Sequence, residues 1–339
     1  MAATAPPMLA QWRAALAPFL IPHAGRATWQ LCNTVGAYLL VWGALWYCVD
    51  VSFWLTAPLV LLAGALLVRV FIIFHDCGHG SLFASRRANT FWGQVTGLLT
   101  WTPFHHWRGE HAIHHGATGD LDRRGIGDVW TMTVQEYQDA SRWRRLCYRL
   151  ARNPVVLLVV APLLLFVVLE RIPRAGAKKH ERRSVWYMTL AVLGMATGMS
   201  FLFGFWSWLV LQLAILMLAG AAGIWLFYMQ HQFADAYWER GNDWDYVAAA
   251  MQGSSFLTLP RVLQWFSGNI GFHHIHHLDP RIPNYHLERC HRSDSRFESV
   301  RAMTMWSSVR SLGLRLWDES SKELVSFRQA RRNCARRQR

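Results

Sequence analysis

The side chains in this sequence best suited to chemistry are its 16 histidines, most of which occur in clusters. Three short stretches stand out: "HDCGH" at 75–79, "HAIHH" at 111–115 and "HHIHH" at 273–277. Residues three or four positions apart lie on one face of an α-helix, so each stretch can direct several imidazoles at a common point. The spacing selects His75, His79, His111, His114, His115, His273, His276 and His277.

Eight imidazoles are too many for one metal ion and suit two ions that keep open positions. Imidazole binds iron, copper and zinc, so the ligand type alone leaves the metal undecided. His231, in "MQHQF" at the end of an apolar stretch, is a further candidate ligand; the alternative is a structural histidine at a helix terminus. His274 falls about 100° around a helix from His273 and is expected to point away from the ions.

Apolar segments of membrane-spanning length must position these histidines. Uncharged stretches of roughly 20 residues can cross the hydrocarbon core as helices. Four such stretches are 27–49, 51–68, 185–203 and 209–229. Two further apolar stretches, 88–104 and 155–169, contain Pro103 and Pro162, and we predict that they are re-entrant or interfacial.

The net charge of +14 is distributed as in a membrane protein rather than a nucleic-acid-binding one. Segment 171–184 carries six Lys or Arg residues and 328–339 is rich in arginine, whereas the connections at 49–54 and 204–207 contain neither residue type. The positive-inside rule then places both basic segments, and both termini, in the cytoplasm. We therefore predict an all-α integral protein of the inner (cytoplasmic) membrane. Its four transmembrane helices form two hairpins, with re-entrant or interfacial helices and a cytoplasmic helical cap that carries the histidines.

Three regions are expected along the chain: an interfacial segment at 1–26, a membrane domain at 27–300 and a basic cytoplasmic tail at 301–339. No stretch resembles a fused haem or iron–sulfur domain, so any electrons are expected to come from a separate partner.

Taken together, "HDCGHGSLF", "WRGEHAIHHGATGDLDRRGIGDVW", "QHQF" and "GFHHIHHLDPRIPNY" resemble the membrane fatty-acid desaturase family over about residues 70–291. The sequence is most similar to the bacterial acyl-lipid branch with Δ12-like or methyl-end desaturases. The resemblance implies a di-iron centre whose ligands are the eight histidines of the three stretches and His231. It also implies O₂ as co-substrate, a hydrophobic tunnel for an acyl-lipid substrate, and a ferredoxin-type donor.

Metal-bound histidines usually donate their second ring N–H to a neighbouring acceptor. The carboxylates near the histidine stretches are Asp76, Glu110, Asp120, Asp122, Asp128 and Asp235. Of these we favour Asp128 and Asp235 as residues that orient ligand rings. His274 is a third residue expected beside the ligands rather than on a metal.

The predicted activity is the O₂-dependent insertion of a cis double bond into a lipid-linked acyl chain. Related alternatives keep the same centre and change the product: a hydroxylase, an acetylenase, or a decarboxylase that forms a terminal alkene. An alternative of another class is a membrane metal-binding or transport protein. A transporter usually carries polar or ionisable residues within its spans, and the four predicted crossings contain almost none.

Overall fold

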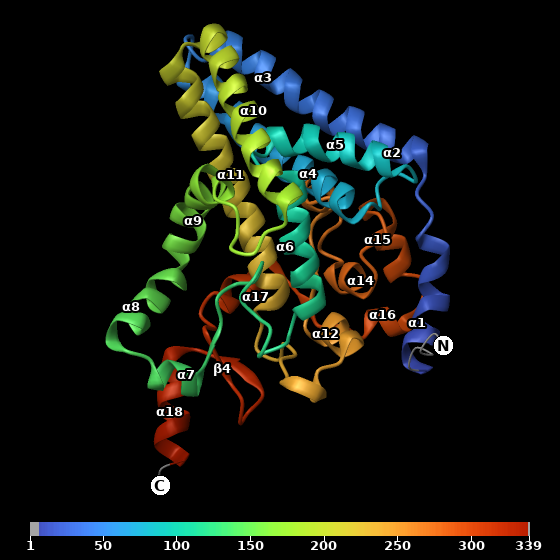
Figure 1. Ribbon diagram of the computed structural model, residues 1–339, viewed down its shortest axis with the longest axis vertical. Coiled ribbons are helices and arrows are strands. Elements are labelled where there is room, and N and C mark those ends of the chain that lie inside the picture. Colours follow the sequence, from blue (N-terminus) through green and yellow to red (C-terminus); the bar gives the residue numbers. More distant parts are fainter. Residues whose placement is uncertain (1–6, 338–339) are drawn as a thin grey trace.

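The computed structural model describes residues 7–337. Within this range, four helical segments are long and apolar enough to cross a membrane, as predicted: Ala24–Cys48, α4 (Phe53–His79), α10 (Lys179–Phe203) and α11 (Phe205–His231). The first of them consists of α2 (Ala24–Leu31), a π-helical turn at Cys32–Gly36 and α3 (Ala37–Cys48). Short turns at 49–52 and at Gly204 join the segments into two hairpins. Figure 1 shows these long helices gathered on one side of the molecule.

Helix α4 continues well beyond the predicted crossing at 51–68. Ser52 begins the helix by accepting a hydrogen bond from the backbone N–H of Trp54. The helix ends at Gly80, whose φ of +72° is the left-handed conformation that glycine adopts without steric cost. Because α4 remains helical up to this point, His75 and His79 lie on its last turns.

Close contacts at glycines hold the long helices together. A Cβ atom at Gly64 of α4 would lie 3.0 Å from the Cβ of Leu218 on α11. At Gly220 of α11, a Cβ atom would lie 2.7 Å from the Cβ of Pro162. The segment around Pro162 therefore packs directly against the backbone of a spanning helix.

The two apolar stretches predicted to be re-entrant or interfacial form shorter helices. The first overlaps α5 (Arg86–Leu99), which begins two residues before the stretch. The second follows α8 (Arg142–Ala151) and includes α9 (Ala161–Leu163), with one π-helical turn before α9 and one after it. Because α8 and Val156–Arg171 meet at 62°, they do not form one straight spanning helix.

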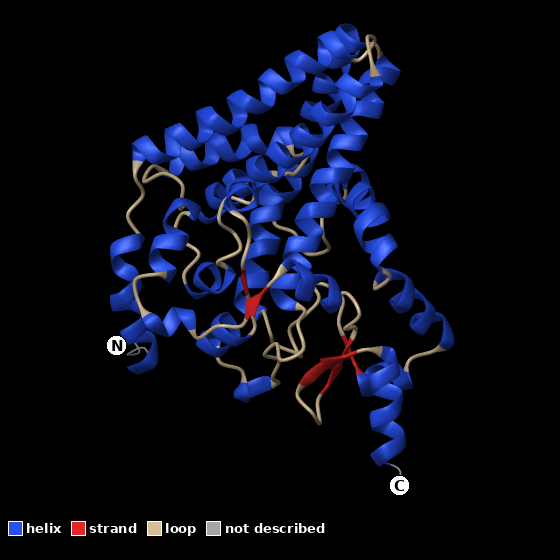
Figure 2. Cartoon of the chain, turned by 180° about the vertical axis from the view of Figure 1, so that it is seen from behind, coloured by secondary structure: helices blue, strands red, loops and turns tan. Residues whose placement is uncertain are grey.

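The remaining elements form a cap below the long helices (Figure 1). Its helices are α1 (Pro7–Leu16), α6 (Phe104–Ala117), α7 (Val134–Asp139), α12 (Tyr246–Gln252), α13 (Arg261–Phe266), α14 (His273–Leu278), α15 (Asn284–His291), α16 (Ser295–Glu298), α17 (Met305–Ser311) and α18 (Phe327–Arg337). The cap is not purely helical. Figure 2 shows short strands within it: β1 (Met132–Thr133), β2 (Phe256–Leu257), β3 (Ala302–Met303), β4 (Leu316–Asp318) and β5 (Glu323–Val325).

The strands connect the end of the chain to the rest of the cap. Strand β4 pairs parallel with β1 and antiparallel with β5, while β2 pairs parallel with β3. Trp317 of β4 and Leu324 of β5 are almost fully buried. Part of the segment expected to be a tail is thus packed into the fold through β4 and β5, and α18 carries its basic end. Helices α1 and α18 both lie on the cap side (Figure 1). Residues 1–6 of the expected interfacial segment and residues 338–339 lie outside the described residues.

Candidate metal centre

Nine histidines from four helices meet where the long helices join the cap. Helix α4 contributes the histidines of the first stretch, α6 those of the second and α14 those of the third, while the last residue of α11 is His231. The cluster comprises His75, His79, His111, His114, His115, His231, His273, His276 and His277. These are the nine side chains that the sequence and its family resemblance suggested.

The cluster divides into two groups. Ligand atoms of His75, His79, His111, His115 and His276 all lie within 4.8 Å of one another, which defines the five-histidine group. The same limit joins His114, His231 and His277. His273 extends this second set to a four-histidine group, because its Nε2 lies 2.9 Å from Nε2 of His231.

The nitrogen spacing within each group suits metal ions. Nε2 of His115 lies 3.1 Å from Nε2 of His111 and 3.0 Å from Nε2 of His276. Two imidazole nitrogens bound to one ion at about 2.1 Å, and about 90° apart, lie roughly 3.0 Å from each other. The buried Nε2 atoms of His79, His114 and His277 have no hydrogen-bond partner within residues 7–337. The donor set therefore fits two ions.

Burial keeps the cap histidines of this cluster in the form that binds metal. Burial, reinforced by the neighbouring imidazoles, holds the pKa of His111, His115, His273, His276 and His277 well below the ordinary value for histidine. A neutral imidazole offers one nitrogen lone pair, whereas the protonated ring offers none. At neutral pH these rings are thus available as ligands.

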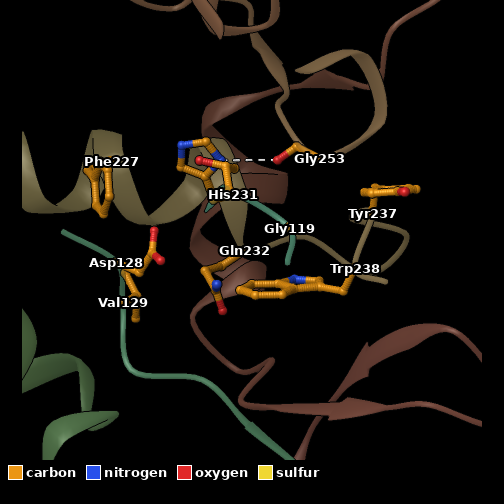
Figure 3. A pocket seen from close by; sticks show the side chains of 10 residues that line it. Gly119, Asp128, Val129, Phe227, His231, Gln232, Tyr237, Trp238 and Gly253 are labelled. Carbon is orange, nitrogen blue, oxygen red and sulfur yellow. Dashed lines mark hydrogen bonds between the residues drawn. The ribbon is translucent and has the colours of Figure 1, made fainter. Parts of the chain in front are cut away.

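Three histidines of the cluster contact an oxygen acceptor outside it through their second ring nitrogen, Nδ1. Nδ1 of His114 lies 2.6 Å from Oδ1 of Asp128, and Nδ1 of His75 lies 3.3 Å from Oδ1 of Asp76. Nδ1 of His231 donates to the carbonyl oxygen of Gly253 at 3.1 Å (Figure 3). A donor proton on Nδ1 leaves the lone pair on Nε2, so these contacts fix which nitrogen faces the cluster.

Comparison of the sequence with known protein families agrees with this geometry. A family model described as fatty acid desaturase matches residues 52–308, which include all nine histidines. The chain belongs to the fatty acid desaturase family. It is therefore an oxidoreductase and an integral membrane protein, and its histidine groups could hold metal.

Named desaturases resemble this one over most of its length. A fatty acid desaturase of Bacillus subtilis is 43% identical over 313 residues, covering 92% of this chain and 89% of the relative. An sn-1 acyl-lipid omega-3 desaturase (ferredoxin) of Nostoc is 28% identical, covering 69% of this chain and 66% of the relative. An sn-1 oleoyl-lipid 12-desaturase of Synechocystis is 26% identical, with 80% and 76% covered.

Two of the carboxylates are placed differently from what we expected of this desaturase. Asp235 was expected beside a ligand, but its side chain is 55% exposed and pairs with Arg301 at 3.5 Å. The chain leaves the helical conformation at Gln232, so Asp235 does not lie on a continuation of the helix that carries His231. Asp76 instead contacts a histidine of the cluster, since its Oδ1 lies 3.3 Å from Nδ1 of His75. In the sequence, only its place within "HDCGH" pointed to Asp76.

His274, the remaining histidine of the third stretch, points away from both groups as expected. Its Nε2 lies 3.1 Å from Nδ1 of His291 on α15, and both residues are buried. His274 thus links two helices of the cap.

The glycine of "HDCGH" allows α4 and α6 to approach each other beside the cluster. A Cβ atom at Gly78 would lie 2.9 Å from the indole ring of Trp107. That indole stacks on His111, with ring centroids 4.3 Å apart. Gly78 therefore lets Trp107 pack between α4 and the histidines of α6.

Proposed function

We propose that this chain is an O₂-dependent desaturase that inserts a cis double bond into a lipid-linked acyl chain, using one iron ion in each histidine group. One observation carries this proposal: the nine clustered histidines divide into a group of five and a group of four. Membership of the fatty acid desaturase family supplies the reaction class.

The ligands in this proposal are the nine histidines themselves. His75, His79, His111, His115 and His276 would hold one iron, and His114, His231, His273 and His277 the other. Bound iron supplies, with O₂, the oxidising power that amino-acid side chains lack for removing hydrogen from an unactivated methylene.

The protein's own residues orient the ligands and limit access of water. The acceptors on Asp76, Asp128 and Gly253 keep the Nδ1 protons of three rings outside the cluster. Seven of the nine histidines are buried, and only His79 and His111 are partly exposed.

The position of the cluster suits a substrate held in the membrane. His75, His79 and His231 lie at the ends of spanning helices. An acyl chain that extends from the bilayer toward the cap would meet the cluster at this boundary. We infer an acyl-lipid substrate and a ferredoxin-type donor, in line with the relatives whose names specify them. We place the enzyme in the inner membrane with both termini cytoplasmic, because of the basic segments at 171–184 and 328–339.

The test is expression in a host that lacks the activity, with ferredoxin and its reductase supplied, followed by mass spectrometry of the lipids and metal analysis of the purified protein. We expect new internal alkenes, a requirement for O₂, and about two irons per chain. Hydroxylated, alkynyl or chain-shortened products without a new internal alkene would establish one of the alternative reactions instead. Zinc or copper, with no dependence on O₂, would indicate a metal-binding or transport protein.

A further inference from the structure

The motif "PNY" at 283–285 follows the third histidine stretch and lies at the start of α15. Its asparagine, Asn284, directs two N–H groups at one oxygen atom. The backbone N–H donates to Oδ2 of Asp76 at 2.7 Å, and side-chain Nδ2 donates to the same oxygen at 2.8 Å. Asp76 and Asn284 are 208 residues apart in sequence, so this contact exists only in the folded cap.

The carboxyl group of Asp76 thereby divides its two oxygens between two partners. Oδ2 receives both donors from Asn284, and Oδ1 lies 3.3 Å from Nδ1 of His75. With Oδ2 held in place, the carboxyl group cannot rotate without breaking these hydrogen bonds. Oδ1 is therefore presented to His75 in one orientation.

The side chain of Asn284 is itself held by Gln30 of α2. Nε2 of Gln30 donates to Oδ1 of Asn284 at 2.7 Å, and Nδ2 of Asn284 lies 3.3 Å from Oε1 of Gln30. This pairing fixes which end of the Asn284 amide faces Asp76. Gln30, Asp76 and Asn284 are 4%, 2% and 1% exposed, so water does not replace these contacts.

We propose that Asn284 is a positioning residue for the metal centre: through Asp76 it fixes the orientation and tautomer of His75, so that Nε2 faces the five-histidine group. Gln30 extends the same chain of hydrogen bonds to the first spanning segment. The inference rests on the proposed function, in which His75 is an iron ligand. Residues that orient a ligand from behind typically contribute about 10- to 100-fold to metal affinity.

Asn284→Leu tests this, with Asn89→Leu as the matched control. Asn89 is also a buried amide, and it bonds the backbone of Phe83 and Ser85 without touching a histidine. Both variants lose buried hydrogen bonds and should unfold at a lower temperature. Only Asn284→Leu should bind iron about 10- to 100-fold more weakly at one site, measured by chelator competition. In the Mössbauer spectrum of the full-length protein, the signal of one iron should change and that of the other remain.

Gln30→Leu provides a second, milder variant if Asn284→Leu fails to fold. It leaves both donors from Asn284 to Asp76 in place and removes only the partner that holds the Asn284 amide, so we expect a smaller loss of iron affinity at the same site. Unchanged iron affinity and spectra in a folded Asn284→Leu or Gln30→Leu protein would overturn the inference, as would an equal loss in Asn89→Leu. Failure of the proposed function shows separately, as wild-type protein that binds no iron or forms no alkene.

Discussion

Asp128 accepts a 2.6 Å hydrogen bond from Nδ1 of His114, fourteen residues earlier in the chain. The loop after α6 must fold back on the helix to make this contact. Gly127 permits it, because its φ is +70° and a Cβ atom there would lie 3.1 Å from the Cβ of His114. Backbone conformation at a glycine thus brings a carboxylate behind one of the proposed ligands.

Replacing Asp128 by Ala should weaken iron binding in the four-histidine group by about 10- to 100-fold, because Nδ1 of His114 loses its acceptor. Chelator competition on the purified protein measures the affinity. The control is Asp122→Ala, since Asp122 is half-exposed and pairs with Arg240 away from the cluster. Equal iron affinity in the two variants would contradict the role of Asp128.

Single substitutions of histidines should distinguish the proposed ligands from His274, which lies beside them. We expect His111→Ala and His231→Ala to lose iron and at least about 100-fold in activity, because each removes a proposed ligand. His274→Ala should keep iron and part of its activity, since its ring contacts His291. Iron content per chain and alkene formation are the measurements. A His274→Ala protein without iron would place that ring among the ligands.

Replacing Gly220 by Leu should destabilise the membrane region by about 1–3 kcal/mol, because the new side chain overlaps Pro162 and Phe166. Gly223→Leu, on the same helix, is the control because its added Cβ meets nothing within 4 Å. Thermal unfolding in detergent compares the two. Similar unfolding temperatures would show that the segment around Pro162 does not pack on α11 in this way.

The iron-free protein should lose stability as the pH falls below about 6.5, the ordinary pKa of histidine in an unfolded chain. Burial and then neighbouring imidazoles lower the pKa of His276 and His277 in the folded state. The unfolded chain therefore binds more protons in acid, which favours unfolding. The unfolding temperature should fall between about pH 8 and about pH 5, and less steeply in His276→Gln. An unfolding temperature independent of pH over this range would contradict the prediction.

Local spacing and hydropathy were enough to predict the four spanning helices and the histidines that meet at their ends. Both signals are periodic: apolar stretches of membrane length specify helices, and positions three or four apart share a helix face. His231 was harder to place, because one histidine at a helix end has no spacing that distinguishes a ligand from a structural residue. The resemblance of the sequence to the desaturase family, rather than the position of His231, suggested that His231 joins the cluster.

Tertiary structure determines which residues orient the histidine rings. Asp76, Asp128 and Asp235 all lie near histidines in sequence, yet Asp235 faces Arg301 because the chain turns at Gln232. Asn284 reaches Asp76 across 208 residues, and Gln30 reaches Asn284 across 254. Such contacts depend on how separate helices pack, which no local period encodes. The sequence by itself therefore determined the helices and the proposed ligands, and only the packing of the cap on the spanning helices decided what orients them.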